Sequence, residues 1–296
     1  MSAIGFLVLL ILAIALLMAL IMKVKLHPTF SLFITALIMG VVMGFFEPEG
    51  FSIGEVLALI NNGFGSTLGS MGIPIMLGAL LAMGVQDTGA AKSIANFFIR
   101  LFRGKNLELA PALTAYIVSI PVFGDITTIL TSNIANVLSK RKHISMGKMA
   151  AFTQTGLNLT HAMVPPTPGI LAVTILLGAD LGLVIGWGVV ISIIGFMLTW
   201  LVLRKWTDKE WVEPLPEVAG EIQETKSDDV KDILITGDDL PGTFPAFLTI
   251  LIPVVLIAGS SFLKMAVAEG TTAYTLANIF GDKVVALGLG VIYTMF

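Results

Sequence analysis

The amino-acid sequence predicts an all-α polytopic membrane protein, and three observations lead to this fold class. Hydrophobic residues make up 56% of the 296 residues and charged residues 12%, a more apolar composition than soluble domains have, and the mean hydropathy is +0.94. Several uncharged apolar runs are long enough for a helix that crosses a bilayer. Basic residues gather in a few segments between these runs.

The first 84 residues are expected to form N-terminal membrane helices that serve largely as a scaffold. Residues 4–22 carry no charge and would form about 28 Å of helix at 1.5 Å per residue, enough to span the bilayer core. Lys23 and Lys25 follow this run in place of a small-residue cleavage site, so it does not resemble a signal peptide. Further spanning helices are predicted at residues 29–46 and near 64–84.

The basic residues predict a topology, because positive charge marks the cytoplasmic side of a membrane protein. With this rule the N-terminus lies outside the cell. Fifteen of the 17 Lys and Arg residues fall in four segments that would share the cytoplasmic face: Lys23–Lys25, Lys92–Lys105, Lys140–Lys148 and Arg204–Lys231.

Residues 85–106 are predicted to form an amphipathic arm in the membrane interface. On a helical projection the apolar side chains fall within an arc of about 140°, with the basic side chains opposite. An ordinary amphipathic connector is the alternative. The apolar set is Ile94, Phe97, Phe98, Leu101 and Phe102, and the basic set is Lys92, Arg100 and Arg103.

Residues 107–182 are expected to form a transport domain that contains a hairpin and a broken helix. The apolar run 109–139 begins and ends beside basic segments but is too short for two crossings of about 20 residues each. Arms at 109–120 and 125–139 would turn at Pro121–Asp125 as a re-entrant hairpin; two short tilted spans are the alternative.

The helix that follows should break at Pro165-Pro166-Thr167-Pro168-Gly169, because proline lacks the N–H that a helix needs. In hydrocarbon, unpaired backbone is tolerated only where protein buries it or where it lines a wet cavity. A helix break beside the ionisable side chain of His161 is typical of a transporter's binding site.

Beyond the break, a membrane helix is predicted at 183–203 and a polar cytoplasmic linker at 204–242. Residues 243–296 hold a spanning helix at 244–263 and a last apolar segment that begins near 284 and ends after about 13 residues, shorter than a span. From this we expect a chain that is truncated at its C-terminus.

Two groups of polar residues are candidates for a binding site. Asp125 is a favoured N-cap, and the helix that it begins would aim the free N–H groups of Thr127 and Thr128 at the middle of the membrane, where they could bind a carboxylate. Gln154, Asn158 and His161 share one helix face. The alternatives are a plain capping role for Asp125 and a structural hydrogen bond for His161.

The sequence lacks the motifs of several other function classes. It holds no Walker loop, zinc-ligand cluster, basic nucleic-acid surface or nucleophile–base arrangement. We therefore expect no catalytic residue, cofactor, resident metal or nucleic-acid partner. An intramembrane enzyme with Asp125 and His161 as its acid–base pair is a rival interpretation, and a purely structural subunit would not need polar broken helices.

The chain resembles the gluconate:proton symporter (gluconate permease) family of the ion transporter superfamily. The combination of Thr-His-Ala with Pro-Pro and Pro-Gly is the most specific part. Three positions depart from the usual family pattern: Gly124 replaces a phenylalanine, Thr167 a histidine and Ile170 a proline. The resembling segments are Gly69–Gly72, Ile120–Phe123 with Asp125, Thr160–Ala162, Pro165–Pro166, Pro168–Gly169 and Leu177–Gly182.

This resemblance implies an inverted-repeat, elevator-type transporter with a re-entrant hairpin and a broken helix, its second repeat incomplete in residues 243–296. It implies proton-coupled uptake of gluconate-like sugar acids or other small hydroxy carboxylates across the bacterial inner membrane by a homo-oligomer. A sodium-coupled carboxylate symporter is the nearest alternative.

We predict that His161, together with Asp125, couples transport to protons. The substrate-binding residues are predicted to be Gly124, Asp125, Thr127, Thr128, Asn158, Pro165, Pro166, Thr167 and Gly169.

Overall fold

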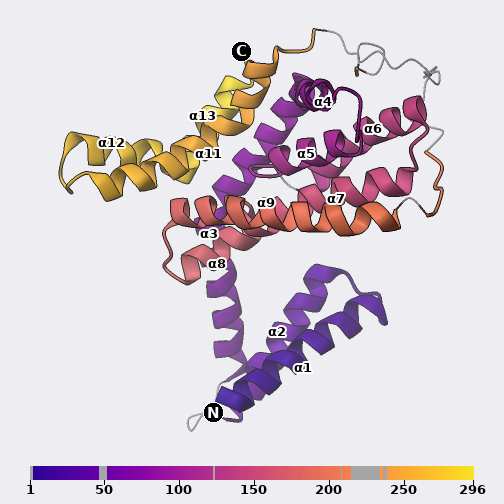
Figure 1. The fold of residues 1–296 in the computed structure, drawn as a ribbon. Coiled ribbons are helices and arrows are strands. Elements are labelled where there is room, and N and C mark those ends of the chain that lie inside the picture. Colours follow the sequence, from indigo (N-terminus) through magenta and orange to yellow (C-terminus); the bar gives the residue numbers. More distant parts are fainter. Residues whose placement is uncertain (1–2, 47–51, 123, 208, 215–233, 236–238) are drawn as a thin grey trace. The chain divides into compact units, whose positions relative to one another are not determined.

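The computed structural model describes residues 3–46, 52–122, 124–207, 209–214, 234–235 and 239–296, and all regular structure in these ranges is helical (Figure 1). The predicted all-α class is confirmed. Four of the helices are long and apolar enough to cross a membrane, or five if one bent pair counts as a span. Most of the predicted linker 204–242, and Phe123 of the hairpin turn, lie outside the described residues.

The chain divides into two compact units, Met1–Gly72 and Ile73–Phe296. In the first unit α1 (Ala3–Met22) packs along α2 (Pro28–Gly44). Gly40 of α2 allows a close approach to the start of α3, because a Cβ atom at this position would overlap the side chain of Val56. Most apolar side chains of α1 are exposed in the structure, as suits a helix in lipid.

Helix α3 (Ile53–Asp87) begins well before the predicted span near residue 64. Its start is a capping box: the Glu55 carboxylate accepts hydrogen bonds from the backbone N–H and the hydroxyl of Ser52, at 2.7 and 2.8 Å. The helix that starts at this capping box also includes residues 53–63, which the predicted span leaves out.

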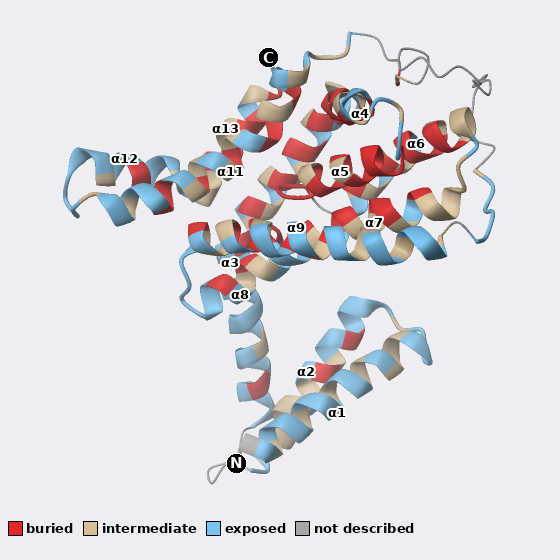
Figure 2. Ribbon diagram, viewed as in Figure 1, coloured by how far each residue is buried: buried red, intermediate tan, exposed pale blue. Residues whose placement is uncertain are grey.

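Four helices contribute to the largest hydrophobic cluster of the second unit together with the end of α3 and the start of the helix at Thr243–Ala266: α4 (Ala90–Leu101), α5 (Leu109–Val118), α6 (Gly124–Lys142) and α7 (Met146–Met163). Figure 2 shows their buried faces in red. The predicted amphipathic segment forms α4, whose face with Ile94, Phe98 and Ile99 is buried in the protein core. Gly156 brings α7 against α5, because a Cβ atom there would overlap the carbonyl oxygen of Ala112.

Five further helices complete the described part of this unit. The predicted proline break separates α7 from α8 (Pro168–Leu176), and the next predicted span is α9 (Leu181–Trp206). The helix expected at 244–263 is α11 (Thr243–Ala266). Helix α12 (Thr272–Phe280) was not predicted from the sequence. It meets α13 (Lys283–Tyr293) at a bend of 65°.

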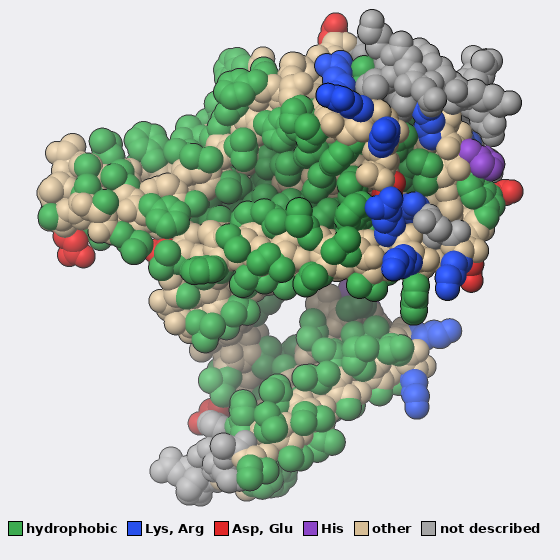
Figure 3. Space-filling view, in the orientation of Figure 1, with side chains coloured by type: hydrophobic (Ala, Val, Ile, Leu, Met, Phe, Trp, Pro, Cys, Tyr) green, Lys and Arg blue, Asp and Glu red, His purple; other side chains and the backbone are tan. Residues whose placement is uncertain are grey.

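The charged side chains of the second unit are unevenly distributed. Figure 3 shows Lys and Arg gathered over one end of the unit, where α6 and α9 end. The last turns of these helices carry Lys140–Lys142 on α6, and Arg204 and Lys205 on α9. Basic side chains at a helix C-terminus also offset its partial negative charge.

Candidate functional site

The hairpin turn between α5 and α6 is joined to the last turn of α7 by hydroxyl groups. The Ser119 hydroxyl donates to the main-chain carbonyl of Leu157 at 3.2 Å and forms a short hydrogen bond with the Thr160 hydroxyl. All three residues are buried. The turn of the predicted hairpin is therefore fixed against the end of the helix that the prolines break.

Gly124 begins α6 and lies directly against α7. A Cβ atom at Gly124 would be 3.4 Å from Leu157 Cδ2 and 3.7 Å from His161 Cδ2, which is ordinary van der Waals contact. The hairpin tip and the imidazole, predicted from separate sequence motifs, are therefore neighbours.

Asp125 lies inside the first turn of α6, so the prediction that it is the N-cap is wrong. Its carboxylate is exposed and interacts electrostatically with His161. The N–H groups of the first three residues of a helix have no intrahelical partners, and for a helix that starts at Gly124 these are residues 124–126. Thr127 and Thr128 are the fourth and fifth residues of α6, so the prediction that their N–H groups are free is wrong.

Two buried polar atoms at this junction have no hydrogen-bond partner within the described ranges. They are Thr127 Oγ1, on a fully buried residue, and His161 Nδ1. A buried polar atom without a partner costs about 1–3 kcal/mol, and such atoms are rare in folded proteins. Their occurrence at the hairpin tip and on the broken helix indicates a place where a polar ligand could bond.

A row of polar side chains continues along α7 from this junction. Gln154 Nε2 donates to the hydroxyl of Thr128 at 3.3 Å, and Asn158 Nδ2 donates to the main-chain carbonyl of Gln154 at 2.8 Å. The Thr128 hydroxyl in turn donates to the carbonyl of Gly124 at 2.8 Å. Asn158 is exposed, and its amide nitrogen is already bonded to Gln154.

Thr167 satisfies backbone groups that the break leaves open. Its hydroxyl donates to the carbonyl of His161 at 2.7 Å and lies 3.3 Å from the carbonyl of Val164. Thr167 is only 3% exposed. The side chain at which this chain departs from the family pattern thus folds back onto the end of α7 and gives the His161 carbonyl a hydrogen-bond partner.

The turn of the hairpin and the broken helix also share a small cavity of about 10 Å³, about the least that can hold one water molecule. Pro121 and Val122 line it from the hairpin, and Pro166 and Thr167 from the break. Pro165 and Pro166 are buried, and the peptide bond between them is cis. Gly169 does not contact the hairpin closely, because a Cβ atom added to it would meet nothing within 4 Å outside the adjacent backbone of its own helix.

The structure therefore brings Gly124 and Asp125 together with His161 and Thr167. Thr127 lies in the first turn of α6, and Asn158 and Gly169 are exposed. Ser119 was not predicted to be part of this junction. Its signal was a serine directly before the Ile120-Pro121 turn in an otherwise apolar segment. Among the residues with described positions, no group of three or more His, Asp or Glu side chains could hold a metal ion.

Comparison with known proteins identifies a family and several relatives of this chain. The family model of the GntP family permeases matches residues 5–296. An uncharacterized permease of Haemophilus influenzae is 31% identical over 97% of this chain and 58% of its own length. A gluconate permease of Zymomonas mobilis is 29% identical over 96% and 60%, and the D-serine transporter DsdX of Escherichia coli K12 is 26% identical over 95% and 60%.

The chain spans about three fifths of the length of these relatives. No solved structure matches it. The relatives with an assigned function are transporters and not enzymes, and the family model covers nearly the whole chain. Together with the apolar helices, this match shows that the chain belongs to the GntP family of permeases, as a multi-pass membrane protein.

Proposed function

We propose that the protein is a secondary active transporter for proton-coupled uptake of gluconate-like sugar acids or other small hydroxy carboxylates across the bacterial inner membrane. The observation that carries this proposal is the contact of Gly124 with His161, which joins the hairpin tip to the broken helix. Relatives are named for gluconate and for D-serine, two compounds that each carry a carboxylate and at least one hydroxyl group.

The carboxylate would bind at the start of α6. The free N–H groups of residues 124–126 and the positive end of the helix dipole favour an anion there. The Asp125 carboxylate opposes a second negative charge close to it, and a proton bound at His161 would offset this repulsion. Binding of substrate and of a proton would then favour each other, as symport requires.

The hydroxyl groups of the substrate would bind to polar groups of both the hairpin tip and the broken helix. Thr127 offers a buried hydroxyl without a partner in the described structure, and Thr128 and Asn158 offer side chains along the same junction. The unwound stretch adds backbone groups from Pro165, Pro166, Thr167 and Gly169.

His161 would carry the coupled proton together with Asp125. An imidazole changes its charge near physiological pH, and Asp125 lies close enough to interact with it electrostatically. The alternative is sodium coupling, which the threonine hydroxyls and the carbonyl groups of the broken helix could support.

For the whole protein we propose an elevator-type, inverted-repeat architecture in a homo-oligomer. Residues 107–182 would form the hairpin and broken helix of the moving domain, residues 1–84 the scaffold, and residues 85–106 the arm between them. The N-terminus would lie outside the cell and linker 204–242 inside it, and residues 243–296 would begin the second repeat.

Uptake by the purified protein in proteoliposomes tests this function. Labelled gluconate and D-serine are offered under a proton gradient alone and under a sodium gradient alone, with protein-free vesicles as the blank. The proposal expects accumulation under the proton gradient. Accumulation only under the sodium gradient would show that sodium, and not the proton, is the coupling ion. No accumulation of any hydroxy carboxylate under either gradient would overturn the proposal.

The role of His161 is tested by exchanging it for glutamine, which keeps a polar side chain but cannot carry the proton. His161→Gln should abolish proton-driven accumulation and preserve exchange of substrate across the vesicle membrane. His27→Gln, an exposed histidine at the start of α2, is the matched control. Unchanged driven uptake by His161→Gln would remove His161 from proton coupling.

A further inference from the structure

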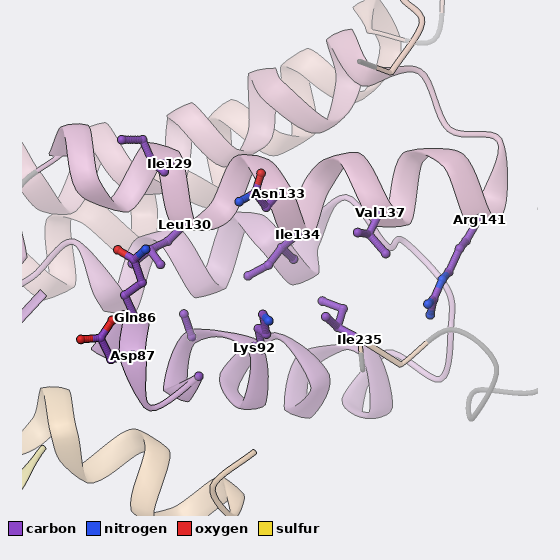
Figure 4. Close-up of a pocket in the computed structure, with 12 residues that line it drawn as sticks. Gln86, Asp87, Lys92, Ile129, Leu130, Asn133, Ile134, Val137, Arg141 and Ile235 are labelled. Carbon is purple, nitrogen blue, oxygen red and sulfur yellow. The ribbon is translucent and has the colours of Figure 1, made fainter. Parts of the chain in front are cut away.

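A second cavity, of about 550 Å³, opens between α6, α4 and the end of α3 (Figure 4). None of the predicted substrate-binding residues lines it. Its walls come from segments far apart in the sequence, including Ile235 from the end of the linker region. Ile235 is held there by Asn96, whose side-chain amide donates to the Ile235 carbonyl at 2.9 Å and accepts from its N–H at 2.7 Å.

One wall of this cavity is aliphatic. Ile129, Leu130, Ile134 and Val137 follow one another along α6, over about 12 Å of helix at 1.5 Å per residue. Ile129 is 59% exposed, so this side of the cavity is open. An aliphatic wall offers no hydrogen bonds to a small polyhydroxylated acid. A hydrocarbon chain, in contrast, binds there with a favourable free energy of about 25 cal/mol for each Å² of apolar surface that it buries.

The opposite side of the cavity carries both signs of charge. Asp87 and Lys92 both line it and are exposed, and their side chains make no ion pair or hydrogen bond within the described part of the chain. Figure 4 shows Asp87 at one end, Arg141 at the other, and Lys92 between them. The Arg141 guanidinium donates to the carbonyl of Leu234 at 2.6 Å, which fixes its position at that end.

The basic residues also indicate the depth of the cavity in the membrane. Lys92 and Arg141 belong to two of the four basic segments that the positive-inside rule assigns to the cytoplasm. Basic pockets between helices on that side of a membrane are suited to lipid head groups. Charged groups therefore lie at both ends of an aliphatic wall and across the cavity from it, an arrangement that suits a lipid with a zwitterionic head group.

We propose that this cavity binds one phospholipid whose head group carries a phosphate and a primary ammonium group, as phosphatidylethanolamine does. The phosphate lies at Lys92, the ammonium group donates to the Asp87 carboxylate, and one acyl chain follows the aliphatic wall of α6. An anionic lipid would leave Asp87 beside added negative charge. A quaternary ammonium group has no N–H to donate to it.

Native mass spectrometry of the purified protein in detergent tests this proposal. The protein is incubated with equal amounts of phosphatidylethanolamine, phosphatidylglycerol and phosphatidylcholine of the same acyl composition. We expect one phosphatidylethanolamine to be retained in preference to the other two. Lys92→Gln should weaken its retention about fivefold, the effect of one basic residue near a lipid surface.

Asp87→Asn should lower the retention of phosphatidylethanolamine to that of phosphatidylcholine without lowering that of phosphatidylglycerol. Lys105→Gln and Glu213→Gln remove exposed charges that do not line the cavity and serve as matched controls. The midpoint of thermal unfolding checks that each variant is folded. Equal retention of the three lipids, a preference for phosphatidylglycerol, or retention that Lys92→Gln and Asp87→Asn leave unchanged would overturn the proposal.

Discussion

Thr167 and His161 are joined across the proline break by a hydrogen bond of 2.7 Å from the threonine hydroxyl to the main-chain carbonyl of the histidine. This bond connects the N-cap position of α8 to the last turn of α7. The residue that holds the imidazole's backbone in place is thus part of the broken stretch itself.

Thr167→Ala should destabilise the protein and weaken transport, because it leaves the His161 carbonyl without this partner. The expected loss is about 1 kcal/mol of stability, the net value of a typical hydrogen bond. Thr167→Ser keeps the hydroxyl and should preserve both properties. Thermal unfolding and substrate uptake measure the two effects. If Thr167→Ala and Thr167→Ser behave alike, the hydrogen bond does not matter.

Gly156→Ala should separate α7 from α5. Any Cβ atom at Gly156 would overlap the carbonyl group of Ala112, a backbone atom that cannot turn aside. Overpacking of this kind costs about 1–3 kcal/mol. Gly259→Ala in α11 is the matched control, since an added Cβ atom there would meet nothing within 4 Å outside the adjacent backbone of its own helix. In a helix this control exchange stabilises by up to about 1 kcal/mol. Equal unfolding midpoints for the two variants would contradict the close approach.

The positions of most helices followed from the sequence because apolar length and proline have direct physical consequences. The break after Met163 is an example, since Pro165 and Pro166 cannot continue a helix. The Ser119–Thr160 bond did not follow, because it joins residues 41 positions apart and depends on how two helices pack. The cavity lined by Asp87, Asn133 and Ile235 could not be predicted for the same reason.

Three helix starts differ from the prediction for other reasons. Asp125 is a common N-cap type, yet the helix takes in Gly124, so Asp125 falls inside its first turn. The early start of α3 was readable, because Ser52 and Glu55 have the spacing of a capping box. Helix α12 likewise begins after Thr271, whose hydroxyl accepts from the Tyr274 N–H at 3.2 Å.

Gly124→Leu should displace the imidazole of His161, because the added side chain must occupy the space next to His161 and Leu157. Gly124→Ala adds only a methyl group at 3.4 Å from Leu157 and should be tolerated. Uptake measured against substrate concentration should show a raised KM for the leucine variant and a nearly unchanged one for the alanine variant. A leucine variant with normal KM would show that this contact does not shape the site.

Thr127→Val separates a binding role from a structural role for the hydroxyl at the hairpin tip. Valine has nearly the shape of threonine, and the Thr127 hydroxyl has no partner in the described structure, so its removal should leave stability unchanged or raise it by about 1 kcal/mol. If the hydroxyl binds substrate, KM should rise at the same time.

Thr131→Val is the matched control for this experiment. Thr131 is also buried on α6, one turn further along, but its hydroxyl donates to the carbonyl of Thr127 at 2.7 Å. Its exchange should lower the unfolding midpoint and leave KM nearly unchanged, the opposite pattern. A Thr127→Val protein that loses stability but transports with normal KM would show that the hydroxyl has a structural partner and no part in substrate binding.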